Sequence, residues 1–444
     1  MSQISRIFTW SRCFILIACL CLLGATTTSG HAQASPAAGG SQYKQLPFGK
    51  KYQKISPDKL KQIEREVKRA IEYNGFSTPD QKKIVEDYYK EYFFPLWTIP
   101  RDRPSPHSKS SFSNLRKRVE ETFKRAKDSQ TFNTLLEMTL ADLEPLATSP
   151  EYSPAVRFNA AYMIGRLDTK LASGRTAPVT YPKALDVLLP LLNNPNENDA
   201  ARYGALLGVV RHAQFNDTNK HSEIIDALLQ QAKTQEVPAN RSPESHEWFR
   251  TTAIEGLAYA KDAEINKVAP ALAEIINSKT ETDSLRLAAA NSLGRLPLTP
   301  TTETNPAVTI RSLGELASKI VQHEVEACEK APEKTLDPAL LMSQLLPIRV
   351  ALCGSEKYVR SPQGGLAAVA KDKAFLEKVL GLVDDWYKKL DDKRFAPDDA
   401  MLPPEGGAVG ALPPAQAATE ELIKDFKRQL PQMEKLVGGT GSPN

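Results

Sequence analysis

The chain has 444 residues, of which 41% are hydrophobic and 25% are charged, an ordinary composition for a folded protein. Its formal net charge of +4 is close to balance for this length, so composition gives no electrostatic reason to expect nucleic acid or an anionic membrane as a partner. A chain this long exceeds one compact core and predicts either several domains or an elongated repeat architecture.

Residues 1–34 have the parts of a secretory signal peptide. Two arginines precede an apolar run over Cys13–Ala25, and Ala32 and Ala34 occupy the small-residue positions that a signal peptidase requires. We expect cleavage after Ala34 and export to the periplasm or the extracellular space. The run is too short for a comfortable membrane span, and no later stretch approaches about twenty apolar residues, so no integral span is expected in the mature chain.

Cys19 offers a competing interpretation of this segment. The string from Leu16 to Cys19 resembles a lipoprotein processing box, which would leave a lipid on the cysteine. Strongly apolar residues continue past it through Leu23, whereas an apolar core normally ends at its processing site. We therefore favour cleavage after Ala34.

Residues 35–112 are expected to form a flexible tether and an N-terminal helical cap. The stretch Ser35–Gly40 has the small residues of a mobile tether. Helices are predicted over Ser56–Gly75 and Thr78–Trp97, because each starts with a capping hydroxyl residue and a first-turn proline, followed by apolar residues at helical spacing. A breaker-rich loop follows the second helix.

From residue 113 one helical pattern follows another, and alternating strand patterns are scarce. Up to residue 296 the predicted helices are Leu115–Lys127, Thr131–Ala147, Ala155–Leu167, Tyr181–Asn193, Ala200–Ala213, Ser222–Lys233, Glu247–Ala260, Ile265–Ser278 and Ser284–Leu296. The sequence therefore predicts an all-α fold.

Four arginines mark a repeat within residues 113–296. They are Arg157, Arg202, Arg250 and Arg286, and an alanine stands three residues after each, with apolar residues four and seven after. These offsets lie on one helix face, where alanine lets a neighbouring helix approach closely. The steps of 45, 48 and 36 residues suit two helices and their turns. Each copy is thus predicted to be a helical hairpin that must stack on its neighbours.

Two of these copies resemble a known family. The segment SPAVRFNAAYMIGRLD (Ser153–Asp168) looks like the second helix of a HEAT repeat, and TDSLRLAAANSLGRL (Thr282–Leu296) is similar. The copies around Arg202 and Arg250 depart from the pattern. The resemblance implies a curved α-solenoid, here in an exported bacterial-type member, and such proteins usually act as protein-binding scaffolds or adaptors.

Residues 297–395 are expected to hold a degenerate repeat and further helices. Ala307–Cys328 and Pro338–Cys353 would pair as a hairpin, and Leu366–Leu390 would form one more helix. Residues 396–414 have the proline and glycine content of a flexible linker. Residues 415–444 contain a last amphipathic helix, over Ala417–Val437, that docks either on the body of the protein or on a partner.

After cleavage the mature chain keeps two cysteines, Cys328 and Cys353. Two cysteines in an exported chain suggest one disulfide, which would clasp the predicted hairpin. However, two antiparallel helices that both end at a cysteine place these residues at opposite ends of the hairpin. A disulfide and two separate buried thiols both remain open.

No local signature of catalytic, metal or cofactor chemistry is present in the sequence. Of the five histidines after residue 34, no two have the spacing of three or four residues that places metal ligands on one helix face. We therefore expect no catalytic, metal-binding or cofactor-binding residues, and the resemblance to HEAT repeats implies a protein partner. A helical enzyme with a site of dispersed residues is the alternative, since catalytic groups need not be adjacent in sequence.

The most unusual composition is YYKEYFFPLW (Tyr88–Trp97), with six aromatic residues in ten. These residues either seal the first helix layer of the repeat stack or, through Tyr88, Tyr92 and Trp97, contact a partner. The partner in that second interpretation is a protein, or a polysaccharide or peptide of the cell envelope. The first interpretation is favoured, because an unsealed stack would expose its core.

The repeat arginines and His212 have similar alternatives. Each arginine either lines a concave face for acidic partners or, as we favour, binds carbonyls and carboxylates of its own repeat turn. His212 occupies the position where Leu167 and Leu296 stand in other copies, and it is expected to cap its helix rather than to bind a ligand.

Overall fold

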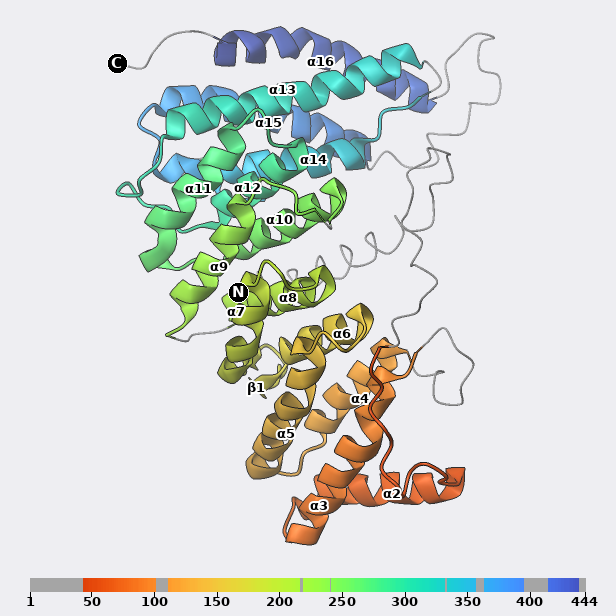
Figure 1. Ribbon diagram of the computed structural model, residues 1–444. Coiled ribbons are helices and arrows are strands. Elements are labelled where there is room, and N and C mark those ends of the chain that lie inside the picture. Colours follow the sequence, from red (N-terminus) through yellow and green to blue (C-terminus); the bar gives the residue numbers. More distant parts are fainter. Residues whose placement is uncertain are drawn as a thin grey trace. The chain divides into compact units, whose positions relative to one another are not determined.

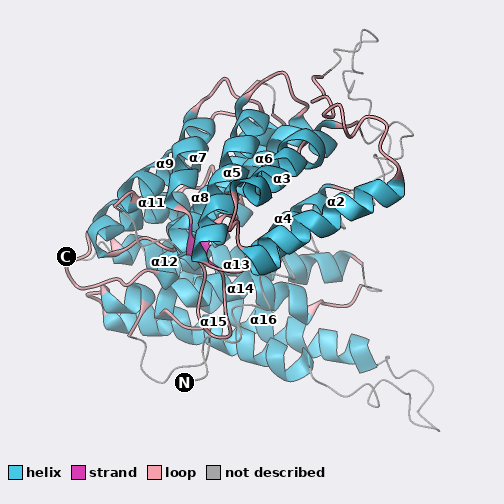
Figure 2. Cartoon of the chain, turned by 90° about the horizontal axis from the view of Figure 1, so that it is seen from below, coloured by secondary structure: helices cyan, strands magenta, loops and turns pink. Residues whose placement is uncertain are grey.

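The computed structural model describes residues 43–100, 111–215, 219–239, 241–331, 334–356, 363–394 and 414–438. The expected leader with Cys19 and the cleavage position Ala34, the tether Ser35–Gly40 and residues 396–413 of the expected linker lie outside the described residues. The described chain is mainly helical, so the all-α prediction is confirmed (Figures 1 and 2). The chain divides into two compact units, Met1–Tyr181 and Pro182–Asn444. None of the helices in the described ranges is long and apolar enough to cross a bilayer.

The first unit begins with α2 (Pro57–Arg69) and α3 (Pro79–Tyr88). Both helices start where the sequence predicts. The hydroxyls of Ser56 and Thr78 accept hydrogen bonds from backbone N–H groups of the first turn, and the proline that follows each one needs no such bond.

Each of these helices continues into a π turn, over Ala70–Asn74 and Tyr89–Phe93. The first ends at Gly75, whose φ of 64° is the left-handed conformation that glycine adopts without strain. The second passes into a short 3₁₀ helix, Pro95–Thr98. The predicted helices therefore exist, and their last turns are wider or tighter than an α-helix.

The unit continues with α4 (Phe112–Lys124), α5 (Ser129–Thr148) and α6 (Pro154–Ile164), of which α5 and α6 pack as a hairpin. Two short antiparallel strands follow, β1 (Asp168–Lys170) and β2 (Val179–Thr180). The sequence pattern did not reveal them, because strands of three and two residues are too short to show an alternation.

In the second unit, α7 to α14 pack as successive helical hairpins (Figure 1). The bounds are Leu185–Asn193 for α7, Asp199–Phe215 for α8, His221–Lys233 for α9, Pro243–Leu257 for α10, Ile265–Asn277 for α11, Asp283–Arg295 for α12, Pro306–Lys330 for α13 and Pro338–Cys353 for α14. The second helices α8, α10, α12 and α14 contact one another in series, and so do the first helices α7, α9, α11 and α13. The hairpins of this unit are therefore stacked in two layers.

The small residues of the repeat lie where helices approach closely. Ala205, Ala253 and Ala289 are completely buried. At Gly294 on α12, a Cβ atom would lie 2.2 Å from the carbonyl oxygen of Val350 on α14. The backbones of two neighbouring second helices meet at this glycine, as the repeat pattern predicts.

The four repeat arginines share one contact. The Nε of each donates to the carbonyl of the penultimate residue of the preceding helix: Arg157 to Ala147, Arg202 to Leu192, Arg250 to Ala232 and Arg286 to Ile276, at N–O distances of 3.1, 3.2, 3.0 and 2.9 Å. All four side chains are buried. Their predicted role within the repeat turn is confirmed, and the alternative of a concave arginine surface is wrong.

The C-terminal part adds α15 (Lys373–Arg394) and α16 (Pro414–Gly438). The helix predicted from Leu366 starts later, because Gly365 has a φ of 55° and a 3₁₀ turn precedes α15. A buried stripe on α16 that includes Leu422, Phe426 and Met433 faces the body, and α16 contacts α13 and α15. Of the two alternatives predicted for this helix, docking on the body of the protein is the one seen in the structure.

Of the two alternatives left open by the sequence, the structure has Cys328 and Cys353 as separate buried thiols. Cys328 lies two residues before the end of α13, whereas Cys353 is the last residue of α14. An α-helix rises 1.5 Å per residue, so the length of α14 places Cys353 about 22 Å from the loop that connects α13 to α14. The Cys353 thiol instead donates to the carbonyl oxygen of Arg349 at 3.2 Å.

Candidate functional site: a cleft between α2 and α4

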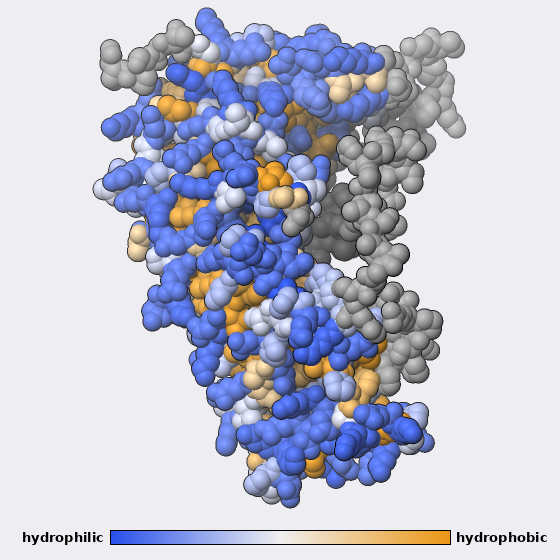
Figure 3. All heavy atoms as spheres, viewed as in Figure 1, coloured by the Kyte–Doolittle hydropathy of each residue, from blue (hydrophilic) through white to orange (hydrophobic). Residues whose placement is uncertain are grey.

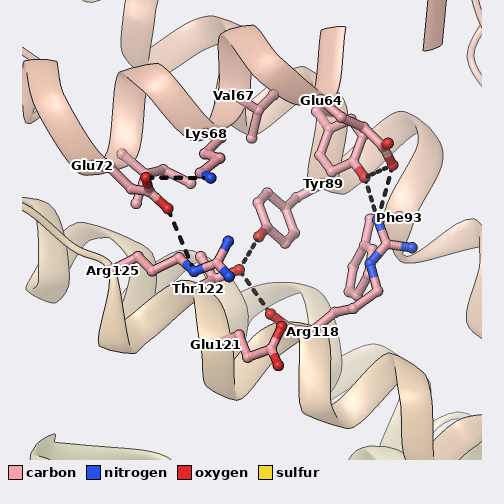
Figure 4. Close-up of a pocket in the computed structure, with 12 residues that line it drawn as sticks. Glu64, Val67, Lys68, Glu72, Tyr89, Phe93, Arg118, Glu121, Thr122 and Arg125 are labelled. Atoms are coloured by element: carbon pink, nitrogen blue, oxygen red, sulfur yellow. Dashed lines mark hydrogen bonds and ion pairs between the residues drawn. The ribbon is translucent and has the colours of Figure 1, made fainter. Parts of the chain in front are cut away.

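A cavity of about 410 Å³ lies between α2 and α4 in the first unit (Figure 4). The end of α3 and its π turn form the floor. The lining residues are Glu64, Val67, Lys68, Ile71, Glu72, Tyr88, Tyr89, Phe93, Arg118, Glu121, Thr122 and Arg125. The volume lies within the range of about 300 to 1,000 Å³ that is usual for ligand sites. The apolar and aromatic groups lie between two sets of charges.

The π turn explains why three aromatic residues so close in sequence line one cavity. The ring centroids of Tyr88 and Tyr89 lie 5.4 Å apart in an edge-to-face arrangement, and those of Tyr89 and Phe93 lie 5.2 Å apart. The wider turn makes residues four and five apart neighbours on the same side. The aromatic segment therefore supplies the floor of the cleft as well as part of the core.

The burial of Tyr88, Tyr92 and Trp97 contradicts the interpretation that these residues contact a partner. Their exposed fractions are 3%, 6% and 0%, so the three side chains belong to the core of the first unit and are not surface anchors. The packing interpretation is the one that the structure supports. Of the three, only Tyr88 reaches the cleft, and there it presents its hydroxyl group.

One end of the cleft is closed by Glu64, Tyr88 and Arg118. The Tyr88 hydroxyl donates to Glu64 Oε1 at 3.0 Å, and Arg118 Nη2 donates to the same oxygen at 3.1 Å and to Tyr88 Oη at 2.6 Å. The guanidinium also lies 4.9 Å from the centroid of the Phe93 ring. This group joins α2, α3 and α4, and we call it the Glu64 clasp.

The protonation states of the Glu64 clasp follow from burial and charge. Burial raises the pKa of Tyr88, so its phenol keeps the proton that it donates to Glu64. Burial disfavours the charged form of Arg118, but the phenol of Tyr88 and the carboxylate of Glu64 outweigh this effect and raise its pKa. The clasp therefore pairs a guanidinium with a carboxylate.

The other end of the cleft is closed by Glu72. Nε of Arg125, the residue that caps the C-terminus of α4, lies 3.4 Å from Glu72 Oε1, and Lys68 Nζ on α2 lies 3.8 Å from Glu72 Oε2. The Glu72 side chain is only 15% exposed, whereas those of Lys68 and Arg125 are 53% and 50% exposed. One enclosed carboxylate thus holds two cations, and we call this group the Glu72 clasp.

Between the clasps, Tyr89 and Thr122 link the floor to α4. The Thr122 hydroxyl donates to the carbonyl oxygen of Arg118 at 2.8 Å, so it accepts the hydrogen of Tyr89, whose Oη lies 2.7 Å away. Burial raises the pKa of Tyr89, which keeps this hydrogen in place. Figure 4 shows this bond between the two clasps.

The arrangement is suited to noncovalent binding. The polar groups at the two ends are held in donor–acceptor pairs, and Val67, Ile71 and Phe93 between them are only 5%, 4% and 1% exposed. In the described ranges, no three His, Cys, Asp or Glu residues lie together in a group that could hold a metal ion. The groups that the cleft presents to solvent are therefore mainly the charged side chains at its two ends.

A second cavity, of about 480 Å³, lies between the end of α13 and the first half of α16. Its lining includes Cys328, Lys334, Thr419 and Ile423, but none of its lining residues is aromatic. The backbone N–H of Leu336 donates to Thr419 across this junction at 3.3 Å. We regard this cavity as part of the docking of α16 and the α2–α4 cleft as the candidate site.

Sequence patterns did not reveal most of the cleft. Glu64 and Arg118 are 54 residues apart, and either one alone is typical of a solvated helix face. His212 lies in the last turn of α8 and is completely buried, and burial lowers its pKa to about 3, so its imidazole is neutral; the expected capping role stays a prediction, because residues 216–218 lie outside the described ranges. Its place in the core matches the leucines of the other copies.

No protein-family model matches the chain, and no curated protein matches it.

Proposed function

We propose that the chain is an exported HEAT-like α-solenoid that acts as a protein-binding scaffold or adaptor. The observation that carries this proposal is the way buried arginines join successive hairpins. In the second unit, Arg250 binds the end of α9 in its own hairpin and Glu281 in the turn of the next. Each hairpin is thereby fixed relative to its neighbour, which suits a protein that presents a preformed surface.

The stack leaves non-repeating side chains of its second helices exposed. Trp248 on α10 is 48% exposed, and its ring is stacked on Tyr203 of α8 with centroids 4.0 Å apart. An exposed, ordered tryptophan loses little side-chain entropy on binding and is a favourable contact residue. This pair lies on different helices of the stack, as expected for a surface built from successive repeats.

Two observations favour binding over the alternatives. The polar groups at the ends of the α2–α4 cleft are paired with one another, which suits recognition more than proton transfer. The polysaccharide alternative relied on exposed aromatic residues between Tyr88 and Trp97, and their burial removes that support.

Site-specific photocrosslinking in the native source tests the scaffold. A photoreactive residue is placed at Trp248 on the stack or at Arg65 beside the cleft, and at Lys279, whose side chain is 82% exposed, as a control. A scaffold gives discrete protein adducts from at least one of the first two positions and none from Lys279. If folded, abundant protein gives no protein adduct at either position, the scaffold function is wrong.

A further inference from the structure

The surface charges on the first helices of the second unit, and on the turns beside them, are paired from one hairpin to the next. The pairs are Lys220 with Asp186, Lys267 with Asp226, Lys233 with Glu274 and Lys279 with Glu315. Figure 3 shows the visible face of this unit as mainly hydrophilic. These charges are therefore balanced within the stack.

Helix α10, a second helix, differs from this pattern. The charged residues of α10 that are not buried are Glu244, Glu247 and Glu255. None of the three forms an ion pair with a residue in the part of the chain that the structure describes. An ionised carboxylate accepts hydrogen bonds and cannot donate them. The charged groups that α10 presents to solvent are therefore acceptors without basic partners.

Glu255 lies where a negative charge is unfavourable. It is in the last turn of α10, two residues before the end of the helix, which carries a partial negative charge. Although the side chain is exposed, neighbouring protein atoms displace part of its water and raise its pKa, against the effect of Arg295 on α12. Arg295 itself donates to Glu356 at 3.3 Å. Glu255 therefore lacks a basic partner of its own at a position that costs stability.

An exposed aromatic residue lies on the same face of α10. Glu244, Trp248 and Glu255 are spaced by four and seven residues, which places them along one stripe of the helix. From the helical rise, Glu244 lies about 6 Å before Trp248 along the axis and Glu255 about 10 Å after it. Tyr203 of α8 covers one face of the Trp248 ring, and the residue is 48% exposed, so the other face is open to solvent. The stripe thus sets an accessible aromatic face between two carboxylates.

We propose that this stripe of α10 binds a basic segment of a partner protein. A Lys or Arg side chain of the segment lies over the open face of Trp248, because an aromatic ring attracts a cation. Further basic residues of the segment pair with Glu244 and Glu255. The proposal rests on the scaffold function and specifies the chemistry of one partner.

A basic segment fits the stripe better than other ligands do. Nucleic acids and anionic lipids carry phosphates, which the carboxylates of α10 repel. A neutral glycan would stack on Trp248 but leave the carboxylates without charged partners. A metal ion needs converging ligands, and in the described ranges no three His, Cys, Asp or Glu residues lie together in a group that could hold one.

The size of the ligand follows from the openness of the stripe. Neither of the two cavities described above includes a residue of α10, so a small cation would remain half in water and reach one carboxylate at a time. A polypeptide links several such weak contacts into one binding event. Its Lys and Arg side chains supply only donors, which match the acceptors of the stripe.

The test begins with selection of short random peptides on the purified full chain, followed by fluorescence anisotropy of the selected peptides. We expect selected sequences with two or more Lys or Arg residues, and replacement of these by Gln should weaken binding by about tenfold or more. Trp248→Ala should have an effect of similar size. Its control, Leu340→Ala on α14, truncates a residue that is 51% exposed elsewhere in the second unit and should leave affinity within about twofold.

The substitution Glu255→Gln separates binding from packing. It removes the charge and keeps the shape, so binding should weaken by about threefold to tenfold. The melting temperature should stay the same or rise, because the charge is unfavourable at the helix end. Glu223→Gln makes the same change at an exposed position of α9 and should leave affinity within about twofold. If circular dichroism shows that Trp248→Ala does not fold, these two variants decide the test.

Three results would overturn the proposal. The first is selected peptides without basic residues, and the second is equal binding by the Glu255→Gln and Glu223→Gln variants. The third is binding of spermidine or of a chitin oligosaccharide that depends on Trp248 and is as tight as peptide binding, which would make the stripe a small-molecule site. If these results occur while a photoreactive residue at position 248 or 65 still gives protein adducts, the scaffold function stands and only the chemistry of its partner fails.

Discussion

Arg250 and Glu281 form a bidentate ion pair in the interior of the second unit. The N–O distances are 2.7 and 2.6 Å, and only 5% and 6% of the two side chains are exposed. Arg250 lies on α10, and Glu281 lies in the turn before α12, so the pair joins two successive hairpins. The same guanidinium holds the end of α9 through the Ala232 carbonyl.

Substitution of Arg250 by alanine should lower the free energy of unfolding by about 3 to 5 kcal/mol. The change leaves the Glu281 carboxylate and a helix-end carbonyl without their partner in a buried site. Urea unfolding followed by circular dichroism measures the loss. The matched control is Arg295→Ala, which removes an ion pair to Glu356 whose side chains are 46% and 61% exposed and should cost less than about 1 kcal/mol. Equal losses in the two variants would contradict the role given to the buried pair.

Because of the buried His212, we expect the free energy of unfolding to fall in acid. Burial lowers its pKa in the folded chain to about 3, while the unfolded value is 6.5. The unfolded chain therefore takes up a proton that the folded chain resists. The contribution of His212 to the free energy of unfolding is fully present above pH 6.5. It is lost as the pH falls toward 3, by about 1.4 kcal/mol per pH unit.

The variant His212→Leu introduces the leucine that two other repeat copies have at this position. It should make the free energy of unfolding depend less on pH. Relative to the natural chain, its free energy of unfolding should rise by about 2 to 3 kcal/mol between pH 7 and about pH 4.5. Urea titrations at several pH values provide the measurement. Parallel pH curves for the two proteins would show that His212 is not the group responsible.

The thiols give a chemical check of the hairpin geometry. Cys328 and Cys353 are free and buried, and burial raises the pKa of each thiol, so both stay protonated and protected. A chain from which residues 1–34 are removed, kept free of reductant, should react slowly with a thiol reagent when native and should show two thiols when denatured. No thiol in the denatured, unreduced chain would mean that a disulfide forms after all.

Sequence alone predicted the repeated features and missed those formed between distant segments. The arginine alignment predicted side chains that bind their own repeat turn, because small and apolar residues follow each arginine at fixed offsets; the buried contact recurs in all four copies, although its carbonyl lies ten residues back in three of them and 18 back from Arg250. Helix starts at Ser56 and Thr78 were also predictable, because capping depends on the few residues that follow.

The cleft was not predictable in this way. Its clasps join α2 to α4 through single pairs such as Glu64 with Arg118, and nothing local distinguishes these residues from other charged residues on a helix surface. The aromatic segment stands out by its composition, but composition does not show which rings face a core. The π turn at Tyr89–Phe93, which aims Tyr89 and Phe93 at the cleft, has no sequence signature that separates it from an α-helix.

Two helical glycines should respond in opposite ways to alanine. At Gly294 the added Cβ would lie 2.2 Å from the carbonyl oxygen of Val350, a backbone atom that cannot move without shifting α14. At Gly381 on α15, no atom lies within 4 Å of the added Cβ. Gly381→Ala should therefore stabilise the protein by about 0.5 to 1 kcal/mol through helix propensity alone. Gly294→Ala gains the same propensity but must push two stacked helices apart, and a net loss of about 1 to 3 kcal/mol is expected. Thermal unfolding of the two variants measures both signs, and stabilisation by both would show that α12 and α14 do not approach as closely as the repeat requires.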